Sequence, residues 1–316
     1  MNLFASIDIG THSAQLLIAG LLSQDQSAQI IPKSETIHSV QLGLEMSPEN
    51  PFIAQSSLDR LKSALLDFRK TIHFTGAQLK CIVLTQACRQ AQNQDEALQI
   101  ISDIFSFESQ IISGELESMW CWQAISHLHQ TQDFVMIDVG AGSTEISDGT
   151  FYLSHPEGAL SLSAEHGVIP NENLHKILTK KFKDYALKNC TKRTLYLSGG
   201  SAAILGALIL DLKSEDLENS DKTDSSRQLE GLEITLDDVQ TTITRLSQIS
   251  ADLRAQLPGL GSGRSHIIIP GLFMIRALIQ LFQPTQIHLS AQGLCLGALV
   301  HSLGLHQGDT DVINEN

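Results

Sequence analysis

Positive charge is scarce in this sequence. Its 316 residues contain 21 lysines and arginines against 35 aspartates and glutamates, which gives a formal net charge of −14. Because general nucleic-acid binding needs a basic surface, this balance argues against a nucleic-acid partner. The excess is concentrated between Asp211 and Asp238, where ten acidic residues meet only three basic ones. Within this stretch, residues 214–230 predict an exposed acidic loop.

Long apolar runs are also missing. No run approaches the roughly 18 residues of a membrane-spanning helix, so we expect no membrane partner. The first residues lack a basic start and reach an acid at Asp8, which is not the pattern of a secretory signal peptide. The cytoplasm is therefore the expected compartment. Apolar residues still make up 42% of the chain, enough for an ordinary globular core.

Paired cysteines are absent. The five cysteines form no C-x-x-C pair, which argues against a zinc site or a redox motif. We expect reduced, buried thiols. The cysteines are Cys81, Cys88, Cys121, Cys190 and Cys295.

Short apolar strands and amphipathic helices alternate along the chain, which predicts an α/β fold. The helix expected over 52–73 would carry Pro51 in its first turn. Later in the chain, helices are expected over 171–189, 236–257 and 268–282. The expected strands are 3–9, 15–22, 28–38, 79–84, 110–112, 134–139, 144–147, 151–155, 194–198 and 286–289.

A repeat stands out against this background. The run Asp8-Ile-Gly-Thr-His-Ser13 and the run Asp138-Val-Gly-Ala-Gly-Ser143 share the pattern D-x-G-x-x-S, and each follows an apolar strand. One such turn is usually only a hairpin, but two copies in the same context predict two related domains. We assign residues 1–128 and 129–306 to them and expect each to offer one glycine turn to a shared cleft.

The residue types in these turns suit phosphate. Glycines let the backbone approach a ligand closely, and successive N–H groups form a nest for an anion. An aspartate at the strand end does not favour direct contact with phosphate, so it is better suited to a hydrated Mg²⁺. Glu145, seven residues after Asp138, adds a second carboxylate to the second turn.

Five blocks in this order resemble the Ppx/GppA family of exopolyphosphatases and guanosine pentaphosphate phosphatases. The blocks are 5–17, Thr85-Gln-Ala-Cys-Arg-Gln-Ala91, Ile112-Ser-Gly-Glu-Leu-Glu117, 137–145 and Leu197-Ser-Gly-Gly200. The resemblance covers roughly residues 3–303 and is of the short, two-domain type. It implies two actin-like or sugar-kinase-like ATPase domains, ribonuclease H-like in topology, that face an interdomain cleft.

The resemblance also implies roles for individual residues. Glu117 matches the catalytic base that activates water, and Arg89 matches an arginine that clamps phosphate. Asp138 and Glu145 match the residues linked to Mg²⁺. Glu115 is expected to raise the proton affinity of Glu117 through like charge. The implied phosphate-binding residues are Asp8, Gly10, Thr11, Ser13, Gly140, Gly142, Ser143, Thr144, Gly199 and Gly200.

The function implied in this way is Mg²⁺-dependent release of terminal phosphate from inorganic polyphosphate or guanosine pentaphosphate. Those two compounds are the expected partners, and a homodimer is left open. Two alternatives stand beside this reading. One is a degenerate member of the family that binds a phosphorylated ligand as a sensor without turnover, and the other is a kinase of the same fold.

Departures from the family pattern favour the sensor. His12 replaces an asparagine in the first turn, Ala141 interrupts the glycines of the second, and Met119 stands where an arginine is usual. Near the end of the chain, Cys295 and Leu296 replace a charged pair. We expect these losses to weaken the binding of long polyanions in particular. The retained Glu117, Arg89, Asp138 and Glu145 speak for catalysis.

Two further features have both a structural and a functional interpretation. Seven of the 21 basic residues lie between Lys176 and Arg193. They form either a solvated helix face or a surface that contacts a polyphosphate tail. Trp120 and Trp122 follow the proposed base on one helix. We expect them to pack the junction between the domains rather than to stack on a nucleotide.

Overall fold

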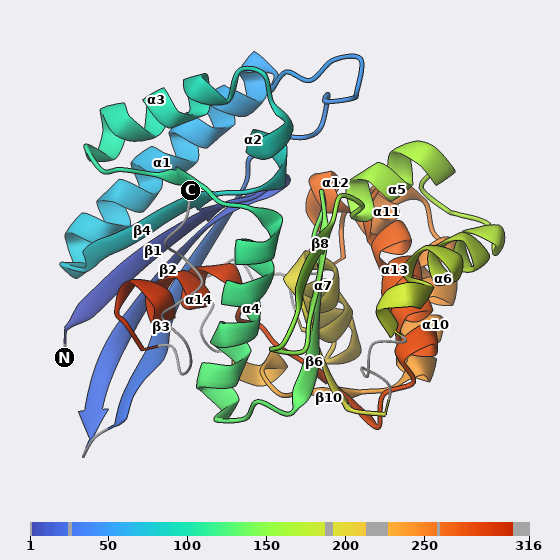
Figure 1. Cartoon of the computed structure of the whole chain (residues 1–316). Helices are drawn as coiled ribbons and strands as arrows, with labels where there is room; N and C mark the ends of the chain where they lie inside the picture. The colour runs from blue at the N-terminus through green and yellow to red at the C-terminus, as the bar shows by residue number, and fades with distance from the viewer. Residues whose placement is uncertain (1, 25–26, 187–191, 213–226, 258–259, 306–316) are drawn as a thin grey trace.

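A computed structural model describes residues 2–24, 27–186, 192–212, 227–257 and 260–305. Two mixed sheets stand side by side, each with helices on its outer face (Figure 1). Within the described residues, no helix is long and apolar enough to cross a bilayer. The α/β class predicted from the sequence is confirmed.

The first sheet has five strands in the order β3-β2-β1-β4-β5. β1 pairs antiparallel with β2 and parallel with β4, so the sheet combines a meander with a parallel crossover. The strands are β1 (Leu3–Ile9), β2 (Ser13–Gln24), β3 (Ser27–Ser39), β4 (Gln78–Leu84) and β5 (Gln110–Ile111). Helices α1 (Gln55–Thr75) and α3 (Gln94–Phe105) cover its outer face (Figure 1). Their leucines and isoleucines bury against β1 and β2, which supplies the main apolar core of this half.

The second sheet repeats this plan with one strand added, in the order β10-β11-β9-β6-β7-β8. β6 pairs antiparallel with β7 and parallel with β9, as β1 does with β2 and β4. The strands are β6 (Phe134–Val139), β7 (Thr144–Ser147), β8 (Tyr152–His155), β9 (Thr194–Ser198), β10 (Glu233–Ile234) and β11 (Gln286–Leu289). The helices of this half are α5 (Ala159–His166), α6 (Asn173–Ala186), α7 (Gly199–Ile209), α10 (Leu236–Ser247), α11 (Ala251–Arg254), α12 (Gly261–Arg264) and α13 (Ile268–Phe282).

Helices α4 (Gly114–His129) and α14 (Leu294–Ser302) lie between the two sheets (Figure 1). Trp120 and Trp122 of α4 share one apolar cluster with Val83 of the first sheet and Met136 of the second, so the predicted role of the tryptophans at the junction is confirmed. α14 packs on β1 and β4 although it follows β11 in the chain. The boundary near residue 128 stays a prediction, because the last helix of the chain lies against the first sheet.

Several element boundaries differ from those predicted. α1 begins at Gln55, so Pro51 precedes the helix instead of lying in its first turn. The helix expected over 236–257 is broken, because the Ser250 hydroxyl accepts the Leu253 N–H at 3.3 Å and starts a new helix there. α5 was not predicted. Its Leu162 is buried and the rest of its sequence shows no strong apolar periodicity.

The acidic loop prediction is wrong at its end. Residues 214–226 of the predicted loop lie outside the described residues. Leu229 is buried, and both carboxylate oxygens of Glu230 have partners: one lies 2.7 Å from Nε2 of His129 and the other accepts the Ala291 N–H at 2.9 Å. Glu230 therefore ties the end of α4 to the segment that leads into α14.

Candidate active site

The two glycine turns have the same local structure. In the first, the Gly10 N–H donates to the Ser13 carbonyl at 2.9 Å, and in the second the Gly140 N–H donates to the Ser143 carbonyl at 3.0 Å. The flanking pairs also correspond, since Asp8 lies opposite Gln15 and Asp138 lies opposite Glu145. The repeat seen in the sequence is therefore a repeat in structure.

The two turns meet each other. A Cβ atom built on Gly142 would lie 2.2 Å from Oγ1 of Thr11 and 3.0 Å from its Cβ, so only glycine allows this approach. Thr11 is itself buried, and its methyl group also packs on Gly43. The two turns consequently belong to one site, and in this conformation they are in contact.

Donors for an anion are available in both turns. Within the described residues, the N–H groups of Thr11, Ala141, Gly142 and Ser143 donate no hydrogen bond. The carbonyl of Ala141 is engaged by the N-terminus of α5, because the Leu160 N–H donates to it at 2.9 Å. These N–H groups form the kind of nest that binds phosphate.

Arg89 and Glu117 form a partly buried ion pair beside the turns. Arg89 lies on the short helix α2 (Gln86–Gln90) after β4, and Glu117 lies in the first turn of α4, which is capped by the Ser113 hydroxyl. Arg89 Nη1 donates to Oε2 of Glu117 at 2.8 Å and to the Ile112 carbonyl at 2.9 Å. Within the described residues, Oε1 of Glu117 accepts no hydrogen bond.

Four carboxyl groups converge on the same space. The pKa of Glu117 is raised to about 7, mainly by burial, with Arg89 lowering it and Asp138 adding to the rise. Burial also raises the pKa of Asp8 well above its ordinary value, with further contributions from Glu117 and Asp138. The pKa of Glu145 is raised by burial and then by the same two neighbours. A cation among these groups would favour their ionised forms, because it would offset the repulsion between like charges.

The acidic residues fit a hydrated Mg²⁺. Asp138 and Glu145 are cross-strand partners, which places their side chains on one face of the sheet. Oδ1 of Asp8 is buried and has no hydrogen-bond partner within the described residues. No group of three or more ligating side chains is assembled there in the described part of the chain. Mg²⁺ does not require one, because it usually keeps several waters and binds one or two carboxylates.

Gly199 and Gly200 lie at the start of α7, next to the second turn. Gly199 has φ +87°, and a Cβ there would lie 2.4 Å from Oδ1 of Asp138, so a side chain is excluded. The Ser198 hydroxyl donates to Oδ2 of Asp138 at 2.7 Å and lowers the pKa that burial raises. The structure brings the predicted Gly199 to Asp138 and the predicted Gly200 to Arg264.

One predicted residue, Thr144, is engaged with the protein itself. The hydroxyl of Thr144 is buried and donates to the Glu157 carbonyl at 2.7 Å. The hydroxyl of Ser143, by contrast, lowers the pKa of Glu145 and so lies toward the carboxyl groups.

Arg264 was missed by the sequence reasoning. Its Nη2 donates to the Ser13 hydroxyl at 2.9 Å and its Nη1 donates to the Gly200 carbonyl at 3.2 Å. It therefore links the first glycine turn to the start of α7 with a positive charge. The available signal was its place directly after Gly261-Ser-Gly263, in a stretch that the helix predictions left unassigned.

Two expectations need correction. Glu115 does not raise the pKa of Glu117, because Glu115 is exposed on another face of α4 and the causes lie elsewhere. Cys295 and Leu296 are buried between α14 and the first sheet. As they stand, these positions present no surface to a polyanion, so their lost charges do not support weaker binding of long chains. Met119 packs against the same cluster as Trp120.

His12 is buried beside the first turn. Burial, together with the nearby charges of Arg264 and Arg60, lowers its pKa to about 3. Its Nε2 lies 3.2 Å from the Ser39 hydroxyl. The residue that replaces the family's asparagine is therefore a neutral hydrogen-bonding group at neutral pH.

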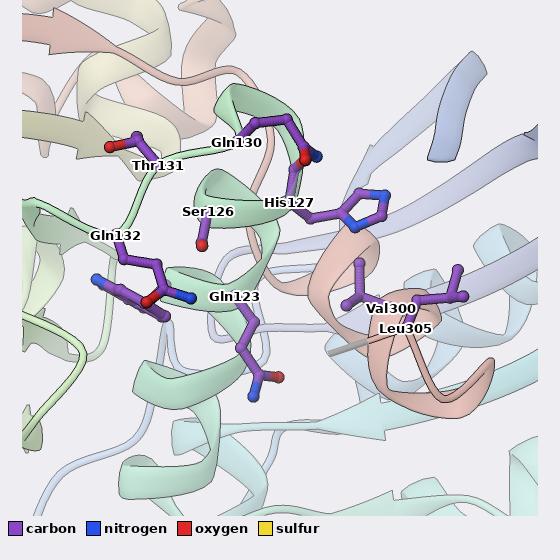
Figure 2. A pocket seen from close by; sticks show the side chains of 9 residues that line it. Gln123, Ser126, His127, Gln130, Thr131, Gln132, Val300 and Leu305 are labelled. Carbon is purple, nitrogen blue, oxygen red and sulfur yellow. The ribbon is translucent and has the colours of Figure 1, made fainter. Parts of the chain in front are cut away.

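One cavity lies beside this arrangement, and another lies away from it. One, of about 380 Å³, opens beside Thr11 and His12, and among the described residues it is lined by no lysine, arginine, aspartate or glutamate. The other, of about 270 Å³, lies along α4 between Trp122, His127 and Leu305 (Figure 2). It contains none of the predicted site residues. The first cavity adjoins the glycine turns and the second does not.

Two sheets of matched topology, whose glycine turns contact each other, define the actin-like ATPase fold. Residues 22–306 match the Ppx/GppA phosphatase family, and the chain belongs to that family. The resemblance and the fold class predicted from the sequence are thus confirmed.

Its relatives carry phosphatase names. The chain is 23% identical to the "Putative exopolyphosphatase" of Haemophilus influenzae, over 93% of this chain and 90% of that protein. It is 24% identical to the guanosine-5'-triphosphate,3'-diphosphate pyrophosphatase of Pseudoalteromonas translucida, over 98% of this chain but only 61% of that longer protein.

Solved structures share the fold. The Aquifex aeolicus Ppx-GppA enzyme superimposes with a TM-score of 0.74 at 22% identity, over 95% of this chain and 99% of that one. An exopolyphosphatase from Cytophaga hutchinsonii gives a TM-score of 0.78 at 18% identity, over 97% and 99%.

Proposed function

We propose that this chain is a Mg²⁺-dependent hydrolase that releases the terminal phosphate of inorganic polyphosphate or guanosine pentaphosphate. The observation that carries the proposal is the convergence of both glycine turns with four interacting carboxyl groups. The turns supply N–H donors for phosphate oxygens. The carboxyl groups supply a base and the ligands for a cation.

In this reaction Glu117 is the general base. Its Oε2 is held by Arg89 and its Oε1 is open to a water. The water loses its proton to Glu117 as its oxygen attacks the terminal phosphorus, and the bridging P–O bond breaks in line with the attack. The products are inorganic phosphate and the substrate shortened by one phosphate. A pKa near 7 suits a group that must accept a proton at neutral pH.

Charge at the terminal phosphate is met by the protein and by the metal. Asp138 and Glu145, with Asp8 opposite, would hold Mg²⁺ through water. When bound, the ion would neutralise phosphate oxygens and the developing charge. Arg264 would add a fixed positive charge beside the first turn. The cavity beside Thr11 offers an extended polyphosphate no ion pairs with lysine or arginine, which favours short substrates.

The test is phosphate release from tripolyphosphate, long-chain polyphosphate and guanosine pentaphosphate, each with and without Mg²⁺ and with no acceptor added. We expect release that requires Mg²⁺ and is faster with the short substrates. Binding without release would support the sensor. Release that appears only when a sugar or acid acceptor is added would support the kinase.

A further inference from the structure

Arg89 is held more firmly than an exposed arginine would be. A guanidinium has five N–H donors. Within the described residues, four of them are used: Nη1 donates to Ile112 and Glu117, while Nε and Nη2 both donate to Oε1 of Gln86, at 3.1 and 2.8 Å. One Nη2–H remains. The side chain is therefore gripped along two edges.

Gln86 is built to provide one of these grips. Its side chain is buried, with 8% exposed. Because arginine offers only donors, the amide must turn its oxygen toward Arg89. Gln86 opens α2 directly after Thr85, whose N–H donates to the Ile9 carbonyl at 3.1 Å and ties this segment to the end of β1. Gln86 therefore lies on a segment that is anchored to the end of β1, next to the first glycine turn.

The grip is transmitted to the base. With its Nε–Nη2 edge fixed on Gln86, Arg89 reaches Oε2 of Glu117 in one orientation and leaves Oε1 of Glu117 free. An arginine without this grip would rotate about its long side chain, and the carboxylate would lose its fixed direction. Small misplacements of a catalytic group are costly, up to about 10²-fold for roughly 1 Å.

We propose that Gln86 is a positioning residue, which orients Glu117 through Arg89. The proposal rests on the proposed hydrolase function. The resemblance assigns no role to Gln86, although Gln86 lies within the matched block from Thr85 to Ala91. The proposal predicts that the amide oxygen of Gln86, and not the bulk of its side chain, is needed to orient Glu117.

Two variants separate these contributions. Gln86→Met keeps the length and volume but removes the acceptor, whereas Gln86→Glu keeps an acceptor for the same edge. We expect kcat to fall by about 10- to 100-fold in Gln86→Met with KM changed less than about threefold, because the base is misplaced while the phosphate turns are intact. Gln86→Glu should retain more activity than Gln86→Met.

A double-mutant cycle tests whether Gln86 acts through Arg89. In the Arg89→Met background, Gln86→Met should cause no further loss. Equal losses in both backgrounds would overturn the proposal, because they would show that Gln86 acts independently. Activity of Gln86→Met close to that of the wild type would overturn it as well.

A spectroscopic measurement keeps the test independent of turnover. The chain has nine arginines, so the Nε–H signal of Arg89 can be assigned in a ¹⁵N spectrum by its loss in Arg89→Lys. We expect a protected signal in the wild type and in Gln86→Glu, and an exchange-broadened one in Gln86→Met. An unchanged signal in Gln86→Met would refute the grip. Absence of phosphate release by the wild type would instead contradict the proposed function. The spectrum would still decide whether Gln86 orients Arg89.

Discussion

Replacing Gly142 by alanine should hold the two glycine turns apart. The added Cβ would lie 2.2 Å from Oγ1 of Thr11, well inside any normal contact, and Thr11 cannot retreat because Gly43 packs on its other side. Overpacking of this kind costs about 1–3 kcal/mol. If that cost falls on the approach of the turns around a substrate, kcat/KM should fall by about 5- to 150-fold.

The assay is phosphate release from tripolyphosphate at saturating Mg²⁺, with thermal unfolding measured alongside. Thr11→Ala removes the closest atom, Oγ1, and serves as the matched control. The two changes should compensate, so that adding Gly142→Ala to Thr11→Ala costs less than adding it to the wild type. If Gly142→Ala has wild-type kcat/KM, the turns do not need to meet and the reasoning about the shared cleft is wrong.

Three further results are expected. The Glu117 carboxyl destabilises the fold progressively between pH 4.5 and about 7, because its raised pKa means that the native state binds more protons there than the unfolded state. Glu117→Gln should therefore gain stability relative to the wild type as the pH rises from 5 to 8. In urea titrations, the gain in the free energy of unfolding should reach up to roughly 3 kcal/mol. Glu230→Ala should lower Tm by about 4–8 °C, since about 2 kcal/mol is lost when the partners on His129 and Ala291 are left unpaired. Mg²⁺ should raise the Tm of the wild type but not that of Asp138→Asn, and an equal rise in both would place the ion elsewhere.

The repeated turns could be predicted because their information is local. Each D-x-G-x-x-S run carries its own glycine and its own strand, and the hydrogen bond that closes each turn spans only three residues. The pairing of Asp138 with Glu145 follows from the length of that turn. The order of the blocks then identified the family, and with it the fold.

The missing parts depend on contacts between distant segments. Arg264 reaches Ser13 from 251 positions away, and no local pattern indicates such a contact. The role of Gln86 depends on which way Arg89 turns, which the sequence does not specify. The acidic composition of residues 214–230 predicted a surface loop over the whole stretch. Glu230 at its end is instead held by hydrogen bonds with His129 and Ala291.

Burial explains why the departures from the family pattern were overweighted. Cys295 and Leu296 were expected to thin a charged surface, whereas they pack between α14 and the first sheet. His12 replaces an asparagine, but its ring still hydrogen-bonds Ser39. A substitution of a charged residue is informative about ligand binding only when the position faces the ligand.

The central claim is that Glu117 activates water in this cleft, and one measurement tests it most directly. Glu117→Gln should be compared with the wild type for turnover of tripolyphosphate and, by calorimetry, for binding of the same compound with Mg²⁺. The account predicts that turnover falls by about 10²–10⁴-fold while affinity changes little, as for the loss of a general base. Turnover near that of the wild type would contradict it.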